Sequence, residues 1–301
     1  MKRYTLLSYN VENKYAARVG ISVTAKADIG LLNEGAFMEA VALVNENIFR
    51  ICTEYKGIFT TIYIIKTDEG VMIFDTASYE CDIEEVLVPF LREKGIAASD
   101  VKGIFISHKH RDHAGGLPYL VKHYPDAVIY SASPVVAEEY AQYQVVYPEE
   151  GRTILSVLVP VAIPGHTADS CALLDTRTKT LITGDCFQVY GIFGQGDWAC
   201  NITFIPEHLS AIEKVRGMDI EEIYTAHDYH PIGYCFIGKD CISKALDGCV
   251  EPLLNIKKMI LTNPEMSDEE IRELYNKNGS LPTVSLGVVR AVRNAAAEGK
   301  I

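Results

Sequence analysis

The chain has 301 residues, with 28 basic and 40 acidic side chains and a formal net charge of −12. This negative balance argues against a protein that coats nucleic acid or binds membranes through a basic surface. Hydrophobic residues make up 48% and charged residues 23%, which excludes disorder as the main state and indicates a globular core. The eight cysteines include no Cys-x-x-Cys pair, so we expect reduced thiols rather than a disulfide framework or a zinc ribbon.

The sequence predicts neither a secretory leader nor a membrane span. The chain opens with basic residues, but the apolar stretch behind them is too short and too polar for a signal peptide. The longest uncharged apolar stretch, 153–168, contains two prolines and would make a poor bilayer helix. We therefore expect a cytoplasmic protein that acts on a small molecule, with neither a nucleic-acid nor a membrane partner.

Residues 1–47 show little periodicity and are assigned to an N-terminal extension, with one short helix predicted within 35–44. From residue 48 onward β-rich runs and helical spacing alternate. A Thr-Asp-Glu-Gly turn joins the first two runs into a predicted hairpin, and Gly95 ends the first helix. We predict strands at 59–65, 71–74, 101–106 and 127–130, and helices at 82–94 and 133–140.

The second half repeats this order of elements. We predict strands at 154–163, 170–174, 180–183 and 222–225, and a helix at 206–215. Two successive blocks of hairpin strands with interleaved helices favour a layered α/β fold in which two sheets pack back to back. Residues 48–238 are therefore assigned to one catalytic domain.

Strand signals stop after residue 238, and helices are predicted at 239–261, 267–275 and 285–298. A Ser-Asp-Glu-Glu capping box opens the second of these helices. Residues 239–301 carry nine basic and nine acidic side chains, so this helical segment is neutral. We interpret it as a lid or a dimerisation element, which allows a homodimer. Its three helices loosely resemble a winged-helix module, but their neutral charge argues against nucleic-acid binding.

Three of the eight histidines fall within six residues, in the run Ser-His-Lys-His-Arg-Asp-His-Ala-Gly-Gly at 107–116. A chance match to this pattern is expected in about one in a few thousand chains of this length. Residues two apart at a strand end project to the same side, so His108 and His110 can bind one ion. The turn that follows brings Asp112 and His113 to a neighbouring position.

Further candidate ligands each follow a predicted apolar strand: His166 in Pro-Gly-His-Thr, Asp185 in Thr-Gly-Asp, and His227 in Thr-Ala-His. Taken singly, each histidine is more often a hydrogen-bonded loop residue, and the aspartate is as often a helix cap. Together with the histidine run, they predict a site for two metal ions at one edge of the sheets. The remaining histidines lack such contexts and are assigned structural or surface roles: His123, His208 and His230, although His230 lies close enough to His227 in sequence to reach the site.

The histidine run, with Gly165-His166-Thr167, Gly184-Asp185 and His227, resembles the metallo-β-lactamase-fold hydrolases over about residues 48–230. The resemblance implies an αβ/βα four-layer sandwich, here with a C-terminal helical extension. It also implies that Asp75 is a carboxylate behind the ligands, although a turn residue at a strand end is the simpler alternative. By the same match, one site comprises His108, His110 and His166, the second comprises Asp112, His113 and His227, and Asp185 bridges them.

Individual motifs narrow this resemblance. Asp185 stands where many β-lactamases of the fold use a cysteine, and Gln188 stands where acyl-homoserine lactonases usually have a tyrosine. His110 is intact, unlike in the flavodiiron branch. The segments at 164–167 and 183–187 are most similar to the glyoxalase-II-like group.

These residues lead to a first hypothesis of a binuclear metal-dependent hydrolase. Two divalent ions would share a bridging hydroxide that attacks an ester, thioester or lactone, and Asp112 would orient that nucleophile or take a proton. Nitrogen-rich coordination favours zinc, with iron or manganese as alternatives. A second hypothesis is a mononuclear iron enzyme similar to persulfide dioxygenases, with His108, His166 and Asp185 as ligands. Phosphodiesterase, nuclease or β-lactamase activity is a further alternative.

A glycine-rich stretch, 189–197, directly follows the Asp185 region. Such a loop could flank the site and receive an acyl group. Its aromatic residues and the tryptophan next to it are candidates for a substrate pocket, with packing under the loop as the alternative: Tyr190, Phe193 and Trp198.

Overall fold

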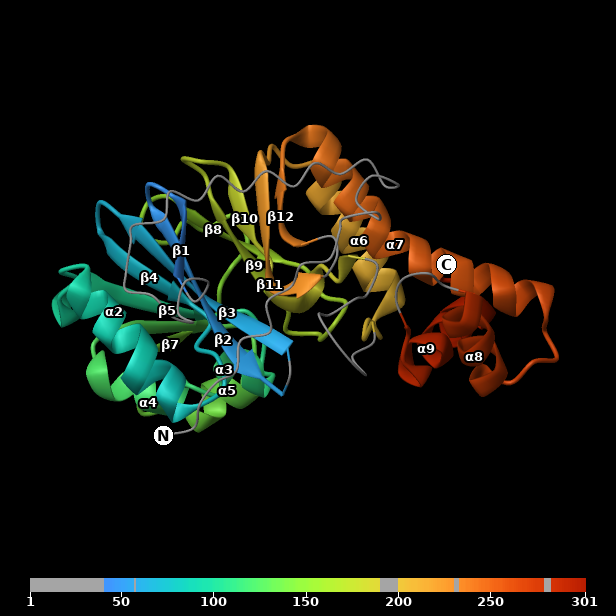
Figure 1. Cartoon of the computed structure of the whole chain (residues 1–301), viewed down its shortest axis with the longest axis horizontal. Helices are drawn as coiled ribbons and strands as arrows, with labels where there is room; N and C mark the ends of the chain where they lie inside the picture. Colours follow the sequence, from blue (N-terminus) through green and yellow to red (C-terminus); the bar gives the residue numbers. More distant parts are fainter. Residues whose placement is uncertain (1–40, 57, 190–199, 230–232, 279–282) are drawn as a thin grey trace, which may run out of the picture.

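The computed structural model describes residues 41–301 except 57, 190–199, 230–232 and 279–282. These residues form two β-sheets that pack face to face, with helices on both outer sides (Figure 1). The αβ/βα sandwich expected from the sequence is thereby confirmed. The C-terminal helices extend beyond the second sheet, away from the first.

The first sheet has seven strands in sequence order. Its first four strands are antiparallel neighbours, and the remainder run parallel to β4. The strands are β1 (Val41–Asn45), β2 (Ile48–Tyr55), β3 (Ile58–Thr67), β4 (Gly70–Phe74), β5 (Val101–Ile106), β6 (Val128–Ser131) and β7 (Val145–Val146).

The second sheet has five strands in the order β12-β11-β10-β9-β8. Its neighbours are antiparallel except for β10 and β11, which are parallel. Pro160 lies in β8 at the edge of the sheet, where its missing N–H costs no ladder hydrogen bond. The strands are β8 (Leu158–Ala162), β9 (Cys171–Asp175), β10 (Thr180–Ile182), β11 (Glu222–Tyr229) and β12 (Gly233–Ile237).

Helices and helical turns connect and cover these sheets. The first group comprises η1 (Asp82–Leu87), α2 (Val88–Glu93), η2 (Ala98–Asp100), α3 (Arg111–Ala114), α4 (Leu117–His123) and α5 (Pro134–Glu139). The second group comprises η3 (Gly184–Cys186), α6 (Ile205–Arg216), α7 (Lys239–Thr262), α8 (Asp268–Asn278) and α9 (Leu286–Ala297). At 24 residues α7 is the longest of them, and no helix among the described residues is both long and apolar enough to cross a bilayer.

Strand β3 shows how the sequence builds the layers. Ile62 and Ile64 face the helices of the first sheet, whereas Tyr63 and Ile65 face the second sheet. All four side chains are fully buried, because successive residues of a strand point to opposite faces and both faces are covered here. The apolar run therefore reflects a strand in the middle of a layered core.

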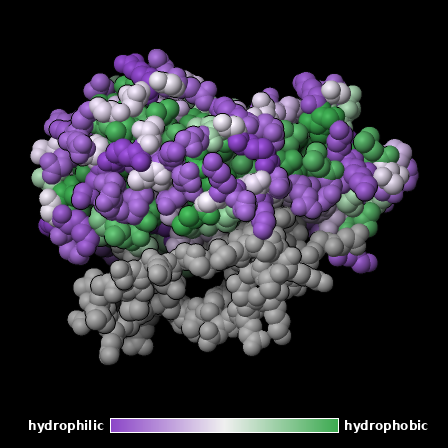
Figure 2. Space-filling model, turned by 90° about the horizontal axis from the view of Figure 1, so that it is seen from above, coloured by the Kyte–Doolittle hydropathy of each residue, from purple (hydrophilic) through white to green (hydrophobic). Residues whose placement is uncertain are grey.

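The C-terminal helices form a core of their own. Leu253 and Ile256 from α7 pack with Ile271 from α8 and Val288 from α9, and Ile205 at the start of α6 joins the same cluster. Long helix α7 therefore links this cluster to the second sheet, against which its first half packs. On the face shown in Figure 2, hydrophilic residues are spread among smaller hydrophobic areas.

Some predicted elements differ from the structure. Within the predicted helix 35–44, residues 41–44 belong to strand β1, which pairs with β2, and residues 35–40 lie outside the described part. The predicted strand 154–163 shrinks to β8, because Leu155 and Ser156 adopt left-handed backbone angles that form a turn. The predicted strand 222–225 was too short. Strand β11 runs on to Tyr229 and is followed by the unpredicted edge strand β12, so His227 lies within a strand rather than after one.

Candidate metal centre

The histidine run lies where β5 ends. His110 is still extended, with φ −65° and ψ 151°, and helix α3 begins at the next residue. The backbone N–H groups of His113 and Ala114 both donate to the carbonyl of His110, at 3.0 and 2.9 Å. This tight turn separates the run into His108 and His110 on one side and Asp112 and His113 on the other.

The second sheet supplies the other candidate residues. His166 follows β8, Asp185 lies in the η3 turn after β10, and His227 lies in β11. Together with the histidine run, they form two groups of ligand atoms, each with all atoms within 4.8 Å of one another. The first group is His108, His110, His166 and Asp185, and the second group is Asp112, His113, His227 and Asp185.

In the first group, three imidazole nitrogens converge. Nδ1 of His110 lies 3.0 Å from Nε2 of His108 and 2.8 Å from Nε2 of His166. Asp185 Oδ2 lies 3.9 and 3.5 Å from the same two Nε2 atoms. Ligands of a tetrahedral zinc ion stand about 3.3 Å apart, given zinc–nitrogen distances of about 2.0–2.1 Å, so this spacing suits such an ion.

The second group has more oxygen. Nε2 of His113 lies 3.1 Å from Asp185 Oδ1 and 3.4 Å from Asp112 Oδ2. Nε2 of His227 lies 2.8 Å from Asp185 Oδ1 and 3.4 Å from the same Asp112 oxygen. Asp185 thus directs Oδ2 to the first group and Oδ1 to the second, which is the arrangement of a bridging carboxylate.

Two atoms of the second group are buried without a hydrogen bond among the described residues: Nε2 of His113 and Oδ1 of Asp185. A buried polar atom left unsatisfied costs about 1–3 kcal/mol. Each has a lone pair directed at the centre of its group when His113 carries its proton on Nδ1. A divalent cation between these atoms would satisfy both, so the donor set fits a metal ion.

Asp75 connects the two groups from behind. Its Oδ2 accepts from Nδ1 of His113 at 2.7 Å and from the Ser107 hydroxyl at 2.8 Å. That hydroxyl in turn accepts from Nδ1 of His108 at 3.0 Å. Both imidazoles thereby carry their proton on Nδ1 and turn Nε2 toward the centre. These contacts favour the role of Asp75 as a carboxylate behind the ligands over that of a simple turn residue. The assignment of the metal ligands themselves is a proposal.

This network imposes backbone constraints. Asp75 adopts a left-handed φ of 61°, which is uncommon outside glycine and marks a strained position. Gly184, just before Asp185, has a φ of 56°, and a Cβ there would lie 2.6 Å from the Ser107 hydroxyl oxygen. Glycine at 184 is therefore required by both the backbone angle and the space beside Ser107.

Strand β3 holds the second group in place from the other side. The carbonyl of Phe59 accepts from Nδ1 of His227 at 2.5 Å, and the Thr60 hydroxyl donates to the Asp112 carbonyl at 2.8 Å. Further along β3, Thr61 and Tyr63 donate to the carbonyls of Ala226 and Thr225, at 2.8 and 2.6 Å. We call these β3–β11 contacts the seam, because they join the two sheets beside the metal centre.

His166 rests on a separate support. Its Nδ1 donates to the Asn201 carbonyl at 2.9 Å, and the Gln188 side chain lies 3.1 Å from the same nitrogen while accepting from the Asn201 N–H. The carbonyl of Gly165 accepts from the N–H groups of Thr203 and Phe204, each at 3.0 Å. The sequence does not predict this role of Gln188 and Asn201, because these contacts depend on tertiary folding.

Burial and charge distinguish the two groups. Burial and the charge of His113 lower the pKa of His108 well below its ordinary value, and burial likewise lowers the pKa of His110. Burial also opposes charge on His113 and His227, but the Asp185 carboxylate raises the pKa of both. These imidazoles in turn hold the pKa of Asp185 well below its usual range despite its burial.

The other histidines lie elsewhere, in keeping with the roles assigned to them. His123 contacts the Glu84 carboxylate at 2.8 Å on the surface. His208 is buried on α6, with Nε2 3.3 Å from the Cys249 carbonyl, and burial lowers its pKa to about 4. The other candidates lie outside the described residues: His230, Tyr190, Phe193 and Trp198.

A family model described as the metallo-beta-lactamase superfamily matches residues 55–227. An atrochrysone carboxyl ACP thioesterase of Emericella nidulans is 28% identical over 189 residues, covering 62% of this chain and 57% of that protein. The atrochrysone carboxyl ACP thioesterase dmxR1 of a Cryptosporiopsis species is 26% identical over 200 residues, covering 63% and 56%. The matched part of the chain thus spans little more than half the length of these relatives.

Solved structures show the same architecture. A metallo-beta-lactamase family protein of Thermus thermophilus superimposes with a TM-score of 0.60 at 14% identity, over 85% of this chain and 95% of that one. A metallo-beta-lactamase of Pontibacter korlensis gives a TM-score of 0.53 at 20% identity, over 69% and 97%. At such identities the likeness concerns the fold alone.

Proposed function

The chain belongs to the metallo-β-lactamase superfamily, and on that premise we propose that it is a metal-dependent hydrolase that cleaves thioesters. The observation that carries the proposal is the division of the Asp185 carboxylate, with Oδ2 toward one ligand group and Oδ1 toward the other. The thioester is taken from the names of the relatives, and esters and lactones are the neighbouring classes to compare.

We assign the two ions to the first and second groups, with Asp185 shared. When bound, they would supply Lewis acidity, which acidifies a water and polarises the substrate carbonyl. The nitrogen-rich first group favours zinc, and iron or manganese would suit the oxygen-richer second group as well. The mononuclear iron alternative uses only the first group and leaves His113, His227 and Asp112 without a role.

Asp112 is the residue we assign to proton transfer. Its side chain is 12% exposed, compared with 7% for Asp185, so water reaches it more readily. Aspartate carboxylates are ionised near neutral pH, so Asp112 can accept a proton from the attacking water. The Thr60 hydroxyl fixes the backbone of Asp112 and so holds this carboxylate in place.

We keep the cytoplasm as the proposed location. The structure describes all eight cysteines as free thiols, which fits a reducing compartment. The proposed substrate is a small thioester.

The proposal is tested by measuring metal content and hydrolysis on the same preparation. We expect about two ions per chain and turnover of acyl-N-acetylcysteamine thioesters, compared with matched oxygen esters and lactones. His123→Gln serves as the control variant, because this histidine contacts Glu84 outside the site, and it should leave both readouts unchanged. A fully loaded protein without thioester hydrolysis would overturn the proposal, as would one iron per chain with oxygen uptake.

A further inference from the structure

Two cations and two aromatic rings contact one another in series. The Lys56 ammonium lies 5.0 Å from the centre of the Tyr55 ring, and the Tyr55 and Tyr79 rings are 6.1 Å apart. The Arg111 guanidinium lies 5.4 Å from the centre of the Tyr79 ring. These distances are those of cation–π and aromatic contacts. We call Lys56, Tyr55, Tyr79 and Arg111 the ladder.

Arg111 ties the ladder to the candidate ligands through the backbone. It is the first residue of α3, directly between His110 and Asp112. Its side chain is exposed, whereas Asp112 next to it is buried in the second group. A group bound by this guanidinium would therefore sit close to the reacting atoms.

The other members of the ladder are held by the segments around them. Tyr55 ends β2 and Lys56 follows it, and the next strand, β3, holds His227 and Asp112 through Phe59 and Thr60. Tyr79 is fixed by its backbone N–H, which donates to the Asp82 carboxylate at 2.9 Å. Arg111 therefore adjoins the second group directly, and the connection from β2 to β3 adjoins it through Phe59 and Thr60.

The charges of the ladder lack a counter-ion within the described part of the chain. There, no carboxylate lies within 4 Å of Lys56 or Arg111, whereas Arg177 and Arg293 each contact an aspartate at 2.6 Å. Arginine binds carboxylates and phosphates through two parallel hydrogen bonds, which makes an oxyanion the natural partner.

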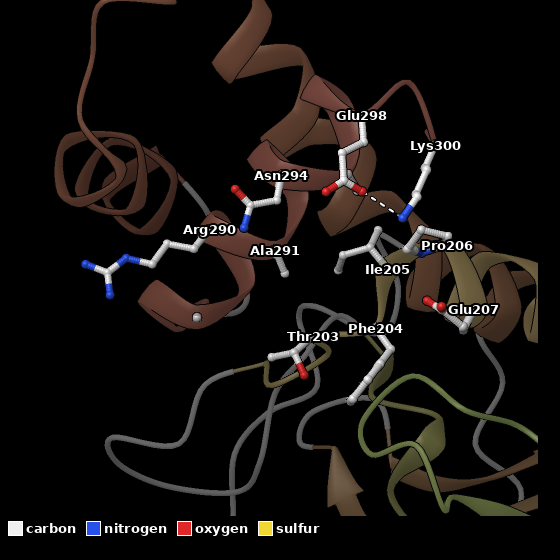
Figure 3. Close-up of a pocket in the computed structure, with 12 residues that line it drawn as sticks. Thr203, Phe204, Ile205, Pro206, Glu207, Arg290, Ala291, Asn294, Glu298 and Lys300 are labelled. Atoms are coloured by element: carbon white, nitrogen blue, oxygen red, sulfur yellow. Dashed lines mark ion pairs between the residues drawn. The ribbon is translucent and has the colours of Figure 1, made fainter.

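A cavity elsewhere provides the contrast. A pocket of about 350 Å³ lies between the start of α6 and α9, lined by Phe204, Ile205 and Arg290 among others (Figure 3). Its cations are already neutralised, because Arg290 contacts Glu269 at 3.0 Å and Lys300 contacts Glu298 at 2.7 Å. The pocket therefore offers no charge for an anion, and the ladder does.

We propose that the ladder binds an oxyanion, a phosphate or a carboxylate, carried by the thioester substrate. Arg111 holds this group, the Tyr79 ring positions the guanidinium, and Tyr55, only 8% exposed, packs behind Tyr79. This inference rests on the proposed function, because the ladder then selects among thioesters. The oxyanion can belong to the thiol arm, as a phosphate, or to the acyl group, as a carboxylate.

Four substrates separate these two sources. Benzoyl-pantetheine 4′-phosphate is compared with benzoyl-pantetheine, and a 2-carboxybenzoyl thioester of N-acetylcysteamine with its benzoyl counterpart. For one of these pairs, we expect the wild type to prefer the anionic member by about tenfold or more in kcat/KM, the range of a charge-assisted hydrogen bond. Arg111→Gln should bring this preference close to one, and Arg111→Lys should restore part of it.

Lys122→Gln is the matched control. Lys122 lies over the Tyr119 ring at 4.9 Å on α4, so the variant removes the same kind of cation–π contact outside the ladder. It should keep both the activity and the preference of the wild type. A structural defect in Arg111→Gln would lower both members of a pair alike, whereas lost recognition changes their ratio.

Binding without turnover gives an independent measurement. We expect 4′-phosphopantetheine or phthalate to bind the wild type about tenfold or more tightly than it binds Arg111→Gln of equal metal content, and neutral pantetheine to bind both alike. If the wild type and Arg111→Gln have the same substrate preference and the same affinity for the anionic ligands, the ladder does not bind an oxyanion. The proposed thioester hydrolysis would be unaffected by that result. Absence of hydrolysis on every thioester would overturn the proposed function, and the titration then still decides for or against the ladder.

Discussion

The two ligand groups share Asp185 but are built differently. The first group has three imidazoles, and burial lowers the pKa values of His108 and His110, the latter only partly buried. The second group has two imidazoles between two carboxylates, which raise the pKa values of those imidazoles. A nitrogen-rich site favours zinc, whereas additional carboxylate oxygens accept harder ions. The difference indicates that the two positions need not have equal metal affinity.

The residue common to both groups should give the largest effect. Asp185→Asn removes the negative charge that both groups share and replaces one carboxylate oxygen by an amide nitrogen. We therefore expect metal content to fall from about two ions to below one. We expect kcat/KM to fall by more than about 100-fold, beyond the range of residues that only support a ligand. Elemental analysis and the thioester assay measure the two effects. A variant that keeps both ions and wild-type turnover would show that Asp185 does not bridge.

A matched pair of substitutions tests whether the groups bind ions separately. His110→Ala removes a ligand of the first group only, and His227→Ala one of the second only. Each should lose about one ion per chain, abolish turnover and leave a folded protein by circular dichroism. Loss of both ions from either variant would instead mean that the groups bind cooperatively.

The residues behind the ligands should give smaller effects. Asp75→Asn deprives His113 of a direct acceptor, whereas Ser107→Ala removes only the hydroxyl that accepts from His108. We expect Asp75→Asn to weaken metal affinity by about 10–100-fold, mainly at the second group, and Ser107→Ala to weaken the first group by less. Competition with a chelator, read by metal content, distinguishes the two. If each variant lost metal affinity equally at the first and the second group, Asp75 and Ser107 would not support separate groups.

The smallest effect concerns the support of His166. In Gly165→Ala, the added Cβ would lie 2.5 Å from Nδ1 of His208, which must shift. We expect a loss of about 1–3 kcal/mol in unfolding free energy, as in other overpacked sites. Gly217→Ala is the control, since the nearest atom to its Cβ is 3.5 Å away. Denaturant unfolding of both variants measures the difference. Equal stability would show that His208 on α6 shifts at no cost in free energy.

The sequence predicted the layered fold and the candidate ligands for a local reason. The histidine run and the Gly-Asp pair are dense, short patterns whose chemistry needs no knowledge of distant contacts. Strand β12 was missed because it is a short edge strand that begins at a glycine. Strand β11 was predicted too short, and His227 was therefore placed after a strand. The supports of the ligands were missed for another reason. The Phe59 and Asn201 carbonyls act through the backbone, so side-chain identity at those positions carries no signal.

The C-terminal segment and the ladder show the same difference between local patterns, which the sequence predicts, and tertiary contacts, which it does not. The three helices predicted for the C-terminal segment correspond closely to α7, α8 and α9, because capping residues and apolar spacing are local signals. The ladder, by contrast, brings together residues 55, 79 and 111, and only the packing of a strand end, a loop and the start of α3 makes them neighbours.

The seam means that this centre exists only while the two halves of the molecule are docked. His108 to His113 belong to the half with the first sheet, and His166, Asp185 and His227 belong to the half with the second. The connection between them is exposed at residues 149–153. A cut there would give two fragments, each with a sheet and an incomplete donor set. Metal uptake would then report their reassociation, and this makes the protein a natural scaffold for a split reporter.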